Sequence, residues 1–561
     1  MDSSAPRCRG RRSDLVSLSV PVLALVVAIP GLWGASGAPM EEGFMLVFGD
    51  LVAKGGVPHV DFLHLYGPGS LWVLAGVYRI AGATIAVERA VGAAQIVVLV
   101  LSIWALARTR GPFMASAASL TATVIVVPLG LVALAWIGAV AAALAGFVAL
   151  TAADRWSQQP HRGRRLVAAG DALGGALAAA ALLYRPDLVV AIVVAVVVWS
   201  VQIPAHRRRW LLGAAAAVSS LWLVHLARSG PLEAFRGMVL EPVFELRPGR
   251  SLPVPPSLGQ VDAFLQRAAL LDRSQWPGIG IPESVQIHLW FWLVPVSILV
   301  ALAGGWTLRR RLPESLAGRA LWPVALFAAF LLPQALQRPD VTHLSWVSVV
   351  TFPVALVLGV ELIARFRPAW SRRRCRAMAC SVSLFVLLVA IGSFPLRGYV
   401  EAVGHTFRGT SSGYPVTRGE RSFPYGSAAD AAAAQEVIDA LDARLQPGER
   451  LVVGPSSLSR TVYSDAWIYS LFDELTPGTR YIEMDPGLAD APGSGLATDV
   501  SMADWVVLSR VWQDWNEPND SQLDGDPEAQ QVLDDQFCEV LDNGRFVLYR
   551  RCGGPTVRPG P

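Results

Sequence analysis

The chain has 561 residues, of which 53% are hydrophobic and only 16% are charged, and its formal net charge at pH 7 is +3. A soluble domain carries roughly 25% charged residues, so this composition is typical of an integral membrane protein. The small net charge and the scattered arginines argue against a basic face for nucleic acid, so no nucleic-acid partner is expected.

The arginines gather in short clusters, and the apolar sequence between consecutive clusters is long enough for two membrane crossings. The clusters lie at residues 7–12, 108–110, 155–165, 207–209, 309–311 and 365–376. Cationic loops stay on the cytoplasmic side of a membrane. The spacing therefore predicts a multi-pass protein of the plasma membrane, with residues 1–14 in the cytoplasm and the polar motifs on the outer face.

A spanning helix needs about 20 mostly apolar residues. Suitable segments lie at residues 15–34, 87–107, 112–127, 131–153, 166–183, 188–203, 210–226, 287–306, 321–334, 343–363 and 378–394. They predict a mainly α fold, a bundle of about 11 transmembrane helices over residues 15–395. The apolar stretch 71–83 is short and carries Arg79, so we expect a juxtamembrane or re-entrant helix there.

Two outer loops are long, at residues 35–86 and 227–286, and long ordered loops more often carry function than linkage. The second loop contains prolines that we expect to break regular structure. These are Pro242, Pro248, Pro253, Pro255 and Pro256.

The first outer loop begins with the acidic pair Glu41 and Glu42, and Asp61, His64 and Tyr66 follow further along it. A carboxylate at the membrane surface suits a general base, because it can take a proton from an incoming hydroxyl group. Acidic residues also favour the first turn of a helix. A solvated helix start is therefore the simpler interpretation of the pair on composition alone.

Two short outer turns, at residues 184–187 and 337–343, share the sequence Arg-Pro-Asp. Proline is a good turn former, so a plain capped loop explains both. Arginine at an outer helix end also suits a phosphate, which it binds by two parallel hydrogen bonds. The convergence of these turns and the acidic pair on one side of the membrane indicates a site for an anionic, lipid-borne substrate.

Residues 396–561 hold most of the carboxylates and contain no segment that could span a bilayer. Apolar runs at 451–454, 505–508 and 546–549 and a helical pattern at 428–445 predict a small α/β domain, which we place on the outer face. Cys538 and Cys552 are candidates for a disulfide there. The aromatic cluster 512–517 either stacks on sugar rings or anchors a loop, and the second role is the commoner one.

The order of these motifs resembles the membrane glycosyltransferases of the GT-C superfamily, in particular the branch with protein O-mannosyltransferases and lipid A aminoarabinose transferases. The motifs are the arginine-flanked first helix, the acidic pair, Asp-Phe at 61–62, Tyr-Gly-Pro-Gly-Ser-Leu at 66–71, Glu-Arg at 88–89 and the two Arg-Pro-Asp turns. The resemblance covers about residues 15–395. It implies transfer of a sugar from a polyprenyl-phosphate donor to an envelope acceptor (polysaccharide, glycolipid or protein), with inversion of the anomeric centre.

The resemblance also implies roles for individual residues. Glu41 stands where the family usually has aspartate and is the expected catalytic base, with Glu42 second. Asp61 matches a position that helps to bind the acceptor, together with His64 and Tyr66. Arg185 and Arg338 are expected to bind the donor phosphate, and Asp187, Asp340 and His343 are expected to shape the pocket. No cofactor is required and a divalent metal is optional, because arginines can stabilise the leaving charge; we predict no metal site.

Two other classes of function remain open at this point. A transporter or flippase for envelope lipids would show pseudo-symmetric halves and broken helices at the midplane, and the sequence shows no such halves. A non-catalytic assembly factor would use the C-terminal domain to bind partners and would tolerate the loss of both Glu41 and Glu42.

Overall fold

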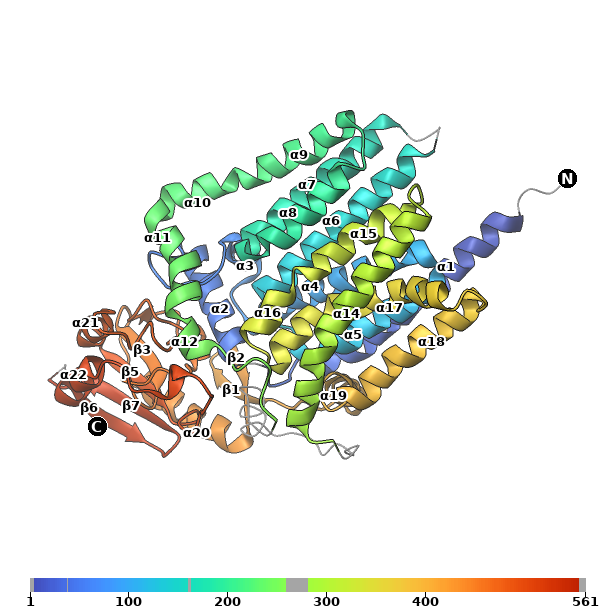
Figure 1. Cartoon of the computed structure of the whole chain (residues 1–561). Helices are drawn as coiled ribbons and strands as arrows, with labels where there is room; N and C mark the ends of the chain where they lie inside the picture. Colours follow the sequence, from blue (N-terminus) through green and yellow to red (C-terminus); the bar gives the residue numbers. More distant parts are fainter. Residues whose placement is uncertain (1–4, 38, 160–162, 259–280, 554–561) are drawn as a thin grey trace.

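The computed structural model describes residues 5–37, 39–159, 163–258 and 281–553. A bundle of long helices forms one part of the molecule, and a smaller domain that contains a β-sheet lies at one end of it (Figure 1). The N-terminal helix projects from the other end of the bundle. The predicted mainly α fold with a C-terminal α/β domain is confirmed.

Within the described residues, nine helical spans are long and apolar enough to cross a membrane, or up to ten if a bent pair is one span. Their helices are α1 (Ala5–Leu32), α4 (Ile85–Ala107), α5 (Pro112–Val126), α6 (Ala135–Ser157), α7 (Arg164–Tyr184), α9 (Ala205–Ser219) with α10 (Leu221–Ser229), α14 (Glu283–Arg311), α15 (Leu316–Ala329) with α16 (Leu332–Gln337), and α17 (Val341–Phe366). The chain is a multi-pass membrane protein.

The other two of the eleven predicted segments are helical but differ from the expectation. Helix α8 (Val189–Ser200) follows the turn η3 (Pro186–Leu188) and has only 12 residues, about 18 Å at 1.5 Å per residue. The last segment forms α18 (Arg372–Phe385) and the wider-turned η5 (Val386–Ala390), and then bends by 80° into α19 (Pro395–Arg408). The bend follows because Pro395 starts a new helix.

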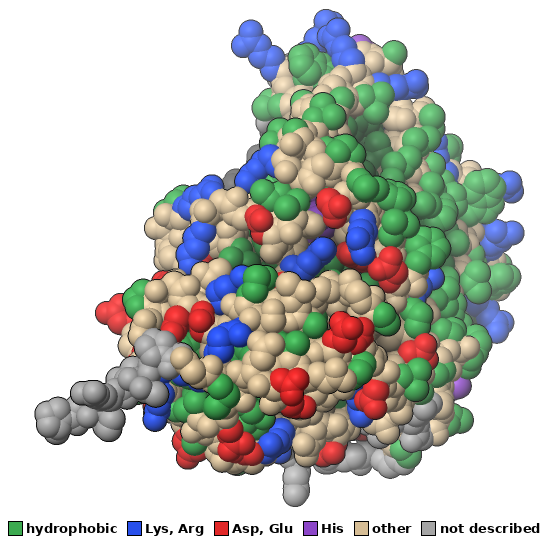
Figure 2. Space-filling model, turned by 90° about the vertical axis from the view of Figure 1, so that its left-hand side faces the viewer, with side chains coloured by type: hydrophobic (Ala, Val, Ile, Leu, Met, Phe, Trp, Pro, Cys, Tyr) green, Lys and Arg blue, Asp and Glu red, His purple; other side chains and the backbone are tan. Residues whose placement is uncertain are grey.

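Large apolar side chains are exposed along the flanks of the bundle, where lipid would cover them. Examples are Val197 on α8, Leu223 on α10, Leu299 on α14 and Leu384 on α18. Figure 2 shows such a hydrophobic flank along the right side of the molecule, whereas acidic and basic groups mingle over the lower part that faces the viewer.

The described parts of the two long loops, residues 35–86 and 227–286, contain several helices. The first contains α2 (Pro39–Ala53) and α3 (Gly69–Ala81), and α3 confirms the short helix expected near residues 71–83. The second contains α11 (Pro231–Phe235), the π-helix η4 (Arg236–Glu245) and α12 (Arg247–Arg250). The expectation that its prolines break regular structure is wrong at Pro242, which η4 accommodates. Pro248 lies in the first turn of α12, a new helix that begins after a break at Leu246, so its missing N–H has no intrahelical partner to lose.

The described part of the C-terminal domain contains a hairpin and a five-stranded sheet of order β4-β3-β5-β7-β6. Its strands are β1 (Tyr414–Arg418), β2 (Arg421–Tyr425), β3 (Arg450–Pro455), β4 (Thr476–Pro477), β5 (Trp505–Ser509), β6 (Phe537–Asp542) and β7 (Phe546–Arg551). Its longer helices are α20 (Ala428–Asp442), α21 (Leu496–Ser501) and α22 (Glu528–Gln536). The predicted strands at 451–454, 505–508 and 546–549 are β3, β5 and β7, and the predicted helix is α20.

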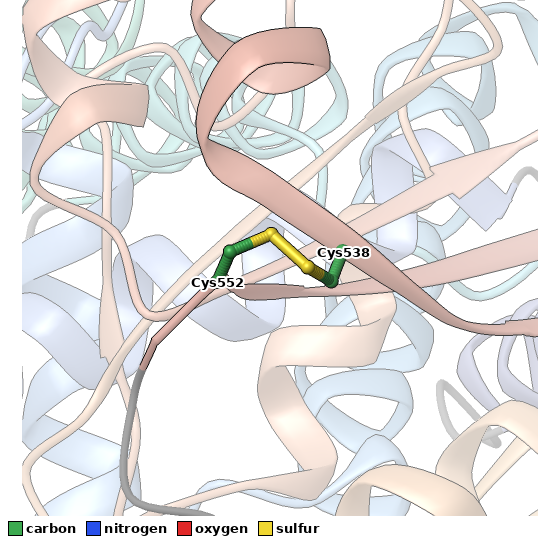
Figure 3. The surroundings of a disulfide bond; sticks show 2 residues. All are labelled: Cys538 and Cys552. Atoms are coloured by element: carbon green, nitrogen blue, oxygen red, sulfur yellow. A yellow bond between two sulfur atoms is a disulfide. The ribbon is translucent and has the colours of Figure 1, made fainter.

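A disulfide joins Cys538 on β6 to Cys552, just beyond β7 (Figure 3). Their Cα atoms are 5.2 Å apart, within the usual range for such a bridge. The candidate pair is therefore joined, and the bond fixes the outer edge of the sheet to the end of its neighbouring strand.

The first outer loop and the C-terminal domain share one hydrophobic core. Phe44 and Phe48 of α2 belong to the same buried cluster as Phe423, Trp467 and Trp505. At Gly43 a Cβ atom would clash with the backbone nitrogen of Trp467, in the 3-10 helix η6 (Ala466–Leu471). Glycine thus permits the close approach that holds the start of α2 against the C-terminal domain.

Candidate active site

A cavity opens where the ends of several bundle helices meet the C-terminal domain. It holds about 1090 Å³ of empty space, part of it open to solvent. The predicted residues Glu41, Tyr66, Arg185, Arg338, Asp340 and His343 all line it. The structure thus brings together residues from both Arg-Pro-Asp turns and from the loop 35–86, which are far apart in the sequence.

Glu41 lies in the first turn of α2, half-buried at the cavity wall. The hydroxyl group of Tyr463, from the C-terminal domain, donates a long hydrogen bond of 3.5 Å to Oε2 of Glu41. The same hydroxyl accepts a hydrogen bond of 3.2 Å from the backbone N–H of Met40. Tyr463 therefore fixes the start of α2 and the carboxylate that the helix presents to the cavity.

Glu42 points away from the cavity and is 1% exposed. Arg89 of α4 binds it with two hydrogen bonds, from Nε to Oε1 at 2.8 Å and from Nη2 to Oε2 at 2.7 Å. Arg89 also donates to the carbonyl groups of residues 32, 33 and 35 at the end of α1. The ion pair of Arg89 and Glu42 therefore joins α1, α2 and α4. Glu42 is thus not a solvated residue at the start of a helix, which was the simpler interpretation of the acidic pair.

The first Arg-Pro-Asp turn follows α7. Arg185 folds back on Asp187, with Nε donating to Oδ1 at 2.9 Å and Nη2 to Oδ2 at 2.8 Å. Its guanidinium group also lies over the rings of Tyr66, at 4.1 Å, and Trp136, at 5.1 Å. Arg185 is buried, whereas Asp187 is about two-fifths exposed and lies outside the cavity lining. The turn therefore places Arg185 in the cavity wall. Asp187, which lies outside the lining, compensates the positive charge of the arginine.

The second turn, between α16 and α17, repeats this geometry. Arg338 donates from Nε to Oδ2 of Asp340 at 2.8 Å, and it also binds both carboxylate oxygens of Glu517 from the C-terminal domain. Asp340 caps α17 by accepting the backbone N–H of His343, and Nδ1 of His343 lies 2.9 Å from the same oxygen. Burial would raise the pKa of Asp340, but His343 and Arg338 outweigh it and hold that pKa well below its ordinary value.

Aromatic rings connect the two turns along the cavity wall. Trp136 stacks on Trp346 with ring centroids 5.6 Å apart, and His343 lies 4.4 Å from Trp346. Burial and the nearby carboxylates raise the pKa of Tyr66 to about 12, although Arg185 lowers it. Tyr66 is therefore a neutral phenol that can donate a hydrogen bond.

Besides Glu42 and Asp187, two further predicted residues lie away from the cavity lining. Asp61 is exposed and accepts a hydrogen bond of 2.7 Å from the backbone N–H of Val57, so it stabilises its own turn. His64 is fully buried against Phe48 and Tyr66. The structure does not bring either side chain to the wall that carries Glu41.

Sequence reasoning missed the contribution of the C-terminal domain and of α12. The C-terminal domain contributes four lining residues, Tyr463, Glu483, Asp485 and Trp515, and α12 contributes Arg250. The aromatic cluster 512–517 was the available signal, since Trp515 lines the cavity and Glu517 binds Arg338. Nothing in the sequence around Glu483 distinguishes it from a surface acid.

Charge is divided within the cavity. Arg185 and Arg338 lie with Asp340 on the wall formed by the two Arg-Pro-Asp turns. The carboxylates of Glu41, Glu483 and Asp485 face the same space, and Arg250 lies among them. Burial raises the pKa of Glu483 well above its ordinary value, and the nearby Asp485 and Glu41 add to this. Such a cavity can hold an anion on its arginine wall and accept protons or hydroxyl groups on its acidic wall.

Among the described residues, no group of three or more His, Cys, Asp and Glu side chains is arranged to hold a metal ion. His59, His64 and His225 do lie together, with Nδ1 of His59 3.0 Å from Nε2 of His225. Burial and the neighbouring His225 lower the pKa of His59 to about 4. The three rings are therefore best described as a buried packing cluster beside the cavity.

The chain was compared with known proteins. A scan against protein-family models found no match, and neither did a search of curated proteins. Among solved structures, ArnT from Cupriavidus metallidurans bound to undecaprenyl phosphate is similar, with 13% identity over 96% of this chain and 98% of that chain and a TM-score of 0.54. The apo state of ArnT gives 12% identity over 95% and 97% of the two chains and a TM-score of 0.52.

The apo form of the Archaeoglobus fulgidus oligosaccharyltransferase matches at a TM-score of 0.44, with 12% identity over 88% of this chain and 69% of that chain. The fold assignment rests on the two ArnT structures, in which nearly the whole of each chain is aligned. The chain therefore has the fold of ArnT, in agreement with the fold that its sequence motifs predicted.

Proposed function

We propose that the chain is a membrane glycosyltransferase that moves a sugar from a polyprenyl-phosphate donor to a hydroxyl group of an envelope acceptor, which is a polysaccharide, a glycolipid or a protein. The observation that carries this proposal is the cavity in which Glu41 shares one space with Arg185 and Arg338. The fold it shares with ArnT, whose structure contains undecaprenyl phosphate, supports a lipid phosphate as the donor.

In the proposed reaction, Arg185 and Arg338 bind the donor phosphate. The bond between the anomeric carbon and the phosphate oxygen breaks, and its electron pair leaves with the phosphate, which the arginines stabilise. The acceptor hydroxyl oxygen forms the new bond to the anomeric carbon, and its proton passes to Glu41. Attack from the face opposite the phosphate inverts the anomeric centre. The phosphate leaves as an anion, so the step needs no general acid.

The positions of the charged groups support an orientation with the cavity outside the cytoplasm. The arginine-rich helix ends, such as the end of α14 and the start of α18, belong to the loops on the other side of the bundle from the Arg-Pro-Asp turns. Cationic loops favour the cytoplasmic side. The C-terminal domain, and the acceptor that reaches the cavity, would then lie on the outer face of the plasma membrane.

A transfer assay tests the proposal. Purified protein in lipid nanodiscs is given radiolabelled polyprenyl-phosphate sugars and a membrane extract as acceptor. Label should move to product with wild type and with Glu539→Gln, which changes an exposed acid on the edge strand β6, but not with Glu41→Gln. Full activity of Glu41→Gln would overturn the assignment of the base. Failure of wild type to bind any polyprenyl-phosphate lipid would overturn the proposed function.

A further inference from the structure

Glu483 is a buried acid with an unusual environment. Its side chain is 8% exposed and lines the cavity, yet it makes no hydrogen bond or ion pair with any residue in the described part of the chain. Asp485 has a partner for only one of its carboxylate oxygens. Oδ1 accepts a hydrogen bond of 2.8 Å from Arg250, whereas Oδ2 is buried and has no hydrogen-bond partner among the described residues. Burying a carboxylate without partners is costly, so the two acids have unused capacity to bind a ligand.

Contacts through Arg250 connect this acidic segment to the proposed phosphate site, and the two acids share the cavity with the proposed base. Nη1 of Arg338 donates to the backbone oxygen of Arg250 at 2.5 Å, and the Arg250 side chain in turn binds Asp485. Glu41 lines the same cavity as both acids, and its charge adds to the raised pKa of Glu483. In a transfer from phosphate to an acceptor activated by Glu41, the moving sugar must lie between these two groups.

The backbone holds the two acids in this place. Met484, which separates them, has a φ angle of +51°, a left-handed conformation that is costly for a residue other than glycine. At Gly249 of α12 a Cβ atom would lie 2.9 Å from the backbone oxygen of Pro486. The close approach of α12 thus fixes the segment that carries both carboxylates.

Aromatic rings complete this wall of the cavity. Tyr463 and Trp515 both line it, with ring centroids 5.3 Å apart. A flat apolar ring covers the C–H face of a sugar, while carboxylate oxygens accept hydrogen bonds from its hydroxyl groups. Acids beside aromatic rings therefore match a hydroxyl-rich ring better than they match a hydrocarbon chain or an anion.

We propose that Glu483 and Asp485 bind the hydroxyl groups of the sugar that the donor lipid carries, so that the C-terminal domain selects which sugar is transferred. This inference rests on the proposed function, since it assumes a polyprenyl-phosphate donor. Hydrogen bonds to a buried carboxyl group discriminate strongly, because a sugar that lacks the matching hydroxyl leaves that group unpaired. Loss of one such contact should weaken binding of the sugar about tenfold to a hundredfold.

Binding measurements without an acceptor test this subsite. Dissociation constants are measured in nanodiscs for undecaprenyl phosphate and for the same lipid carrying glucose, mannose or arabinose. Wild type should bind at least one glycosylated lipid more tightly than the bare phosphate lipid. Glu483→Gln and Glu483→Leu should lose that preference while binding undecaprenyl phosphate as wild type does, and Glu539→Gln should keep it. Equal thermal stability of the variants establishes that they are folded.

The outcomes separate the two proposals. A preference that survives both substitutions at Glu483 overturns the sugar subsite, and so does wild type that binds all four lipids equally. Wild type that binds none of the lipids instead overturns the proposed function. Loss of affinity for the bare phosphate lipid in the Glu483 variants would assign the residue to the phosphate site and also overturn the inference.

Discussion

Arg338 and Glu517 form a buried ion pair that joins the second Arg-Pro-Asp turn to the C-terminal domain. Nη1 of Arg338 donates to Oε2 of Glu517 at 3.0 Å and Nη2 binds the other oxygen. Glu517 is 1% exposed. A carboxylate that binds a guanidinium group through two oxygens uses the same N–H donors that a phosphate would use. Binding of a lipid phosphate at Arg338 would therefore compete with Glu517 or share the arginine with it.

This relationship predicts how Glu517→Gln behaves. Removing one partner of a buried ion pair destabilises a protein by about 3–5 kcal/mol, because the other charge loses its compensation. We expect a lower melting temperature for Glu517→Gln, and we expect undecaprenyl phosphate to raise that temperature more than it raises that of wild type. Differential scanning fluorimetry with and without the lipid measures both effects. An equal lipid-induced shift in the two proteins would show that the phosphate does not interact with Arg338.

Substitutions of the adjacent acids Glu41 and Glu42 should have different effects, the first on the transfer rate and the second on stability. Glu41→Gln keeps the shape of the side chain and should lower transfer by about a hundredfold or more, the usual contribution of a general base, with little change in melting temperature. Glu42→Gln leaves Arg89 buried without its partner carboxylate and should destabilise the protein by about 3–5 kcal/mol. Initial rates and melting curves of both variants test this. The reverse pattern, in which Glu42→Gln is stable but inactive, would make Glu42 the base.

The sequence predicted most of the helices and the three main strands because their signals are local. Apolar runs of spanning length mark the bundle, and continuous apolar runs mark β3, β5 and β7. The sequence also predicted that Glu41, Arg185 and Arg338 lie on the same side of the membrane, since every second loop of a multi-pass protein lies on that side. The two departures, at α8 and at the bend before α19, occur where a proline begins a new helix.

The remaining parts of the site depend on contacts between distant residues. Tyr463 and Glu483 reach the cavity only because the C-terminal domain packs on α2 through Gly43, and no local pattern encodes that packing. Arg250 reaches it because the loop forms the helices η4 and α12 around Pro242 and Pro248, separated by a bend at Leu246. Likewise, nothing near Glu42 in the sequence shows that its partner is Arg89, 47 residues later.

The buried histidines predict that stability decreases at mildly acidic pH. Burial, together with His225, lowers the pKa of His59 to about 4, and burial lowers that of His64 well below its ordinary value. The unfolded chain takes up protons below about pH 6.5 while the folded protein does not, so stability is complete above that pH. It should then fall toward pH 4 by about 1.4 kcal/mol per pH unit for each histidine. The low pKa of Asp340 acts only below about pH 4, whereas the raised pKa of Glu483 acts in the opposite direction within this window, so a variant of one histidine isolates the effect of that histidine.

Melting temperatures between pH 7.5 and 4.5 check this prediction. His59→Asn is the informative variant, because His59 has a φ angle of +74° and asparagine tolerates that conformation. Its melting temperature should depend less on pH than that of wild type, even where it is lower overall. An identical pH dependence in the two proteins would exclude His59 as a source of the effect.

The disulfide should contribute to the stability of the C-terminal domain without contributing to the chemistry. It closes a loop of 14 residues at the outer edge of the sheet, on β6, and its cysteines do not line the cavity. A loop of this length corresponds to about 3 kcal/mol of stabilisation. The double variant Cys538→Ser, Cys552→Ser should therefore be cleaved faster by protease at the C-terminal end, and it should retain the wild-type transfer rate at low temperature. A transfer rate that falls together with protease resistance would show that the edge of the sheet is coupled to the cavity, through the strand β7 that pairs with β5.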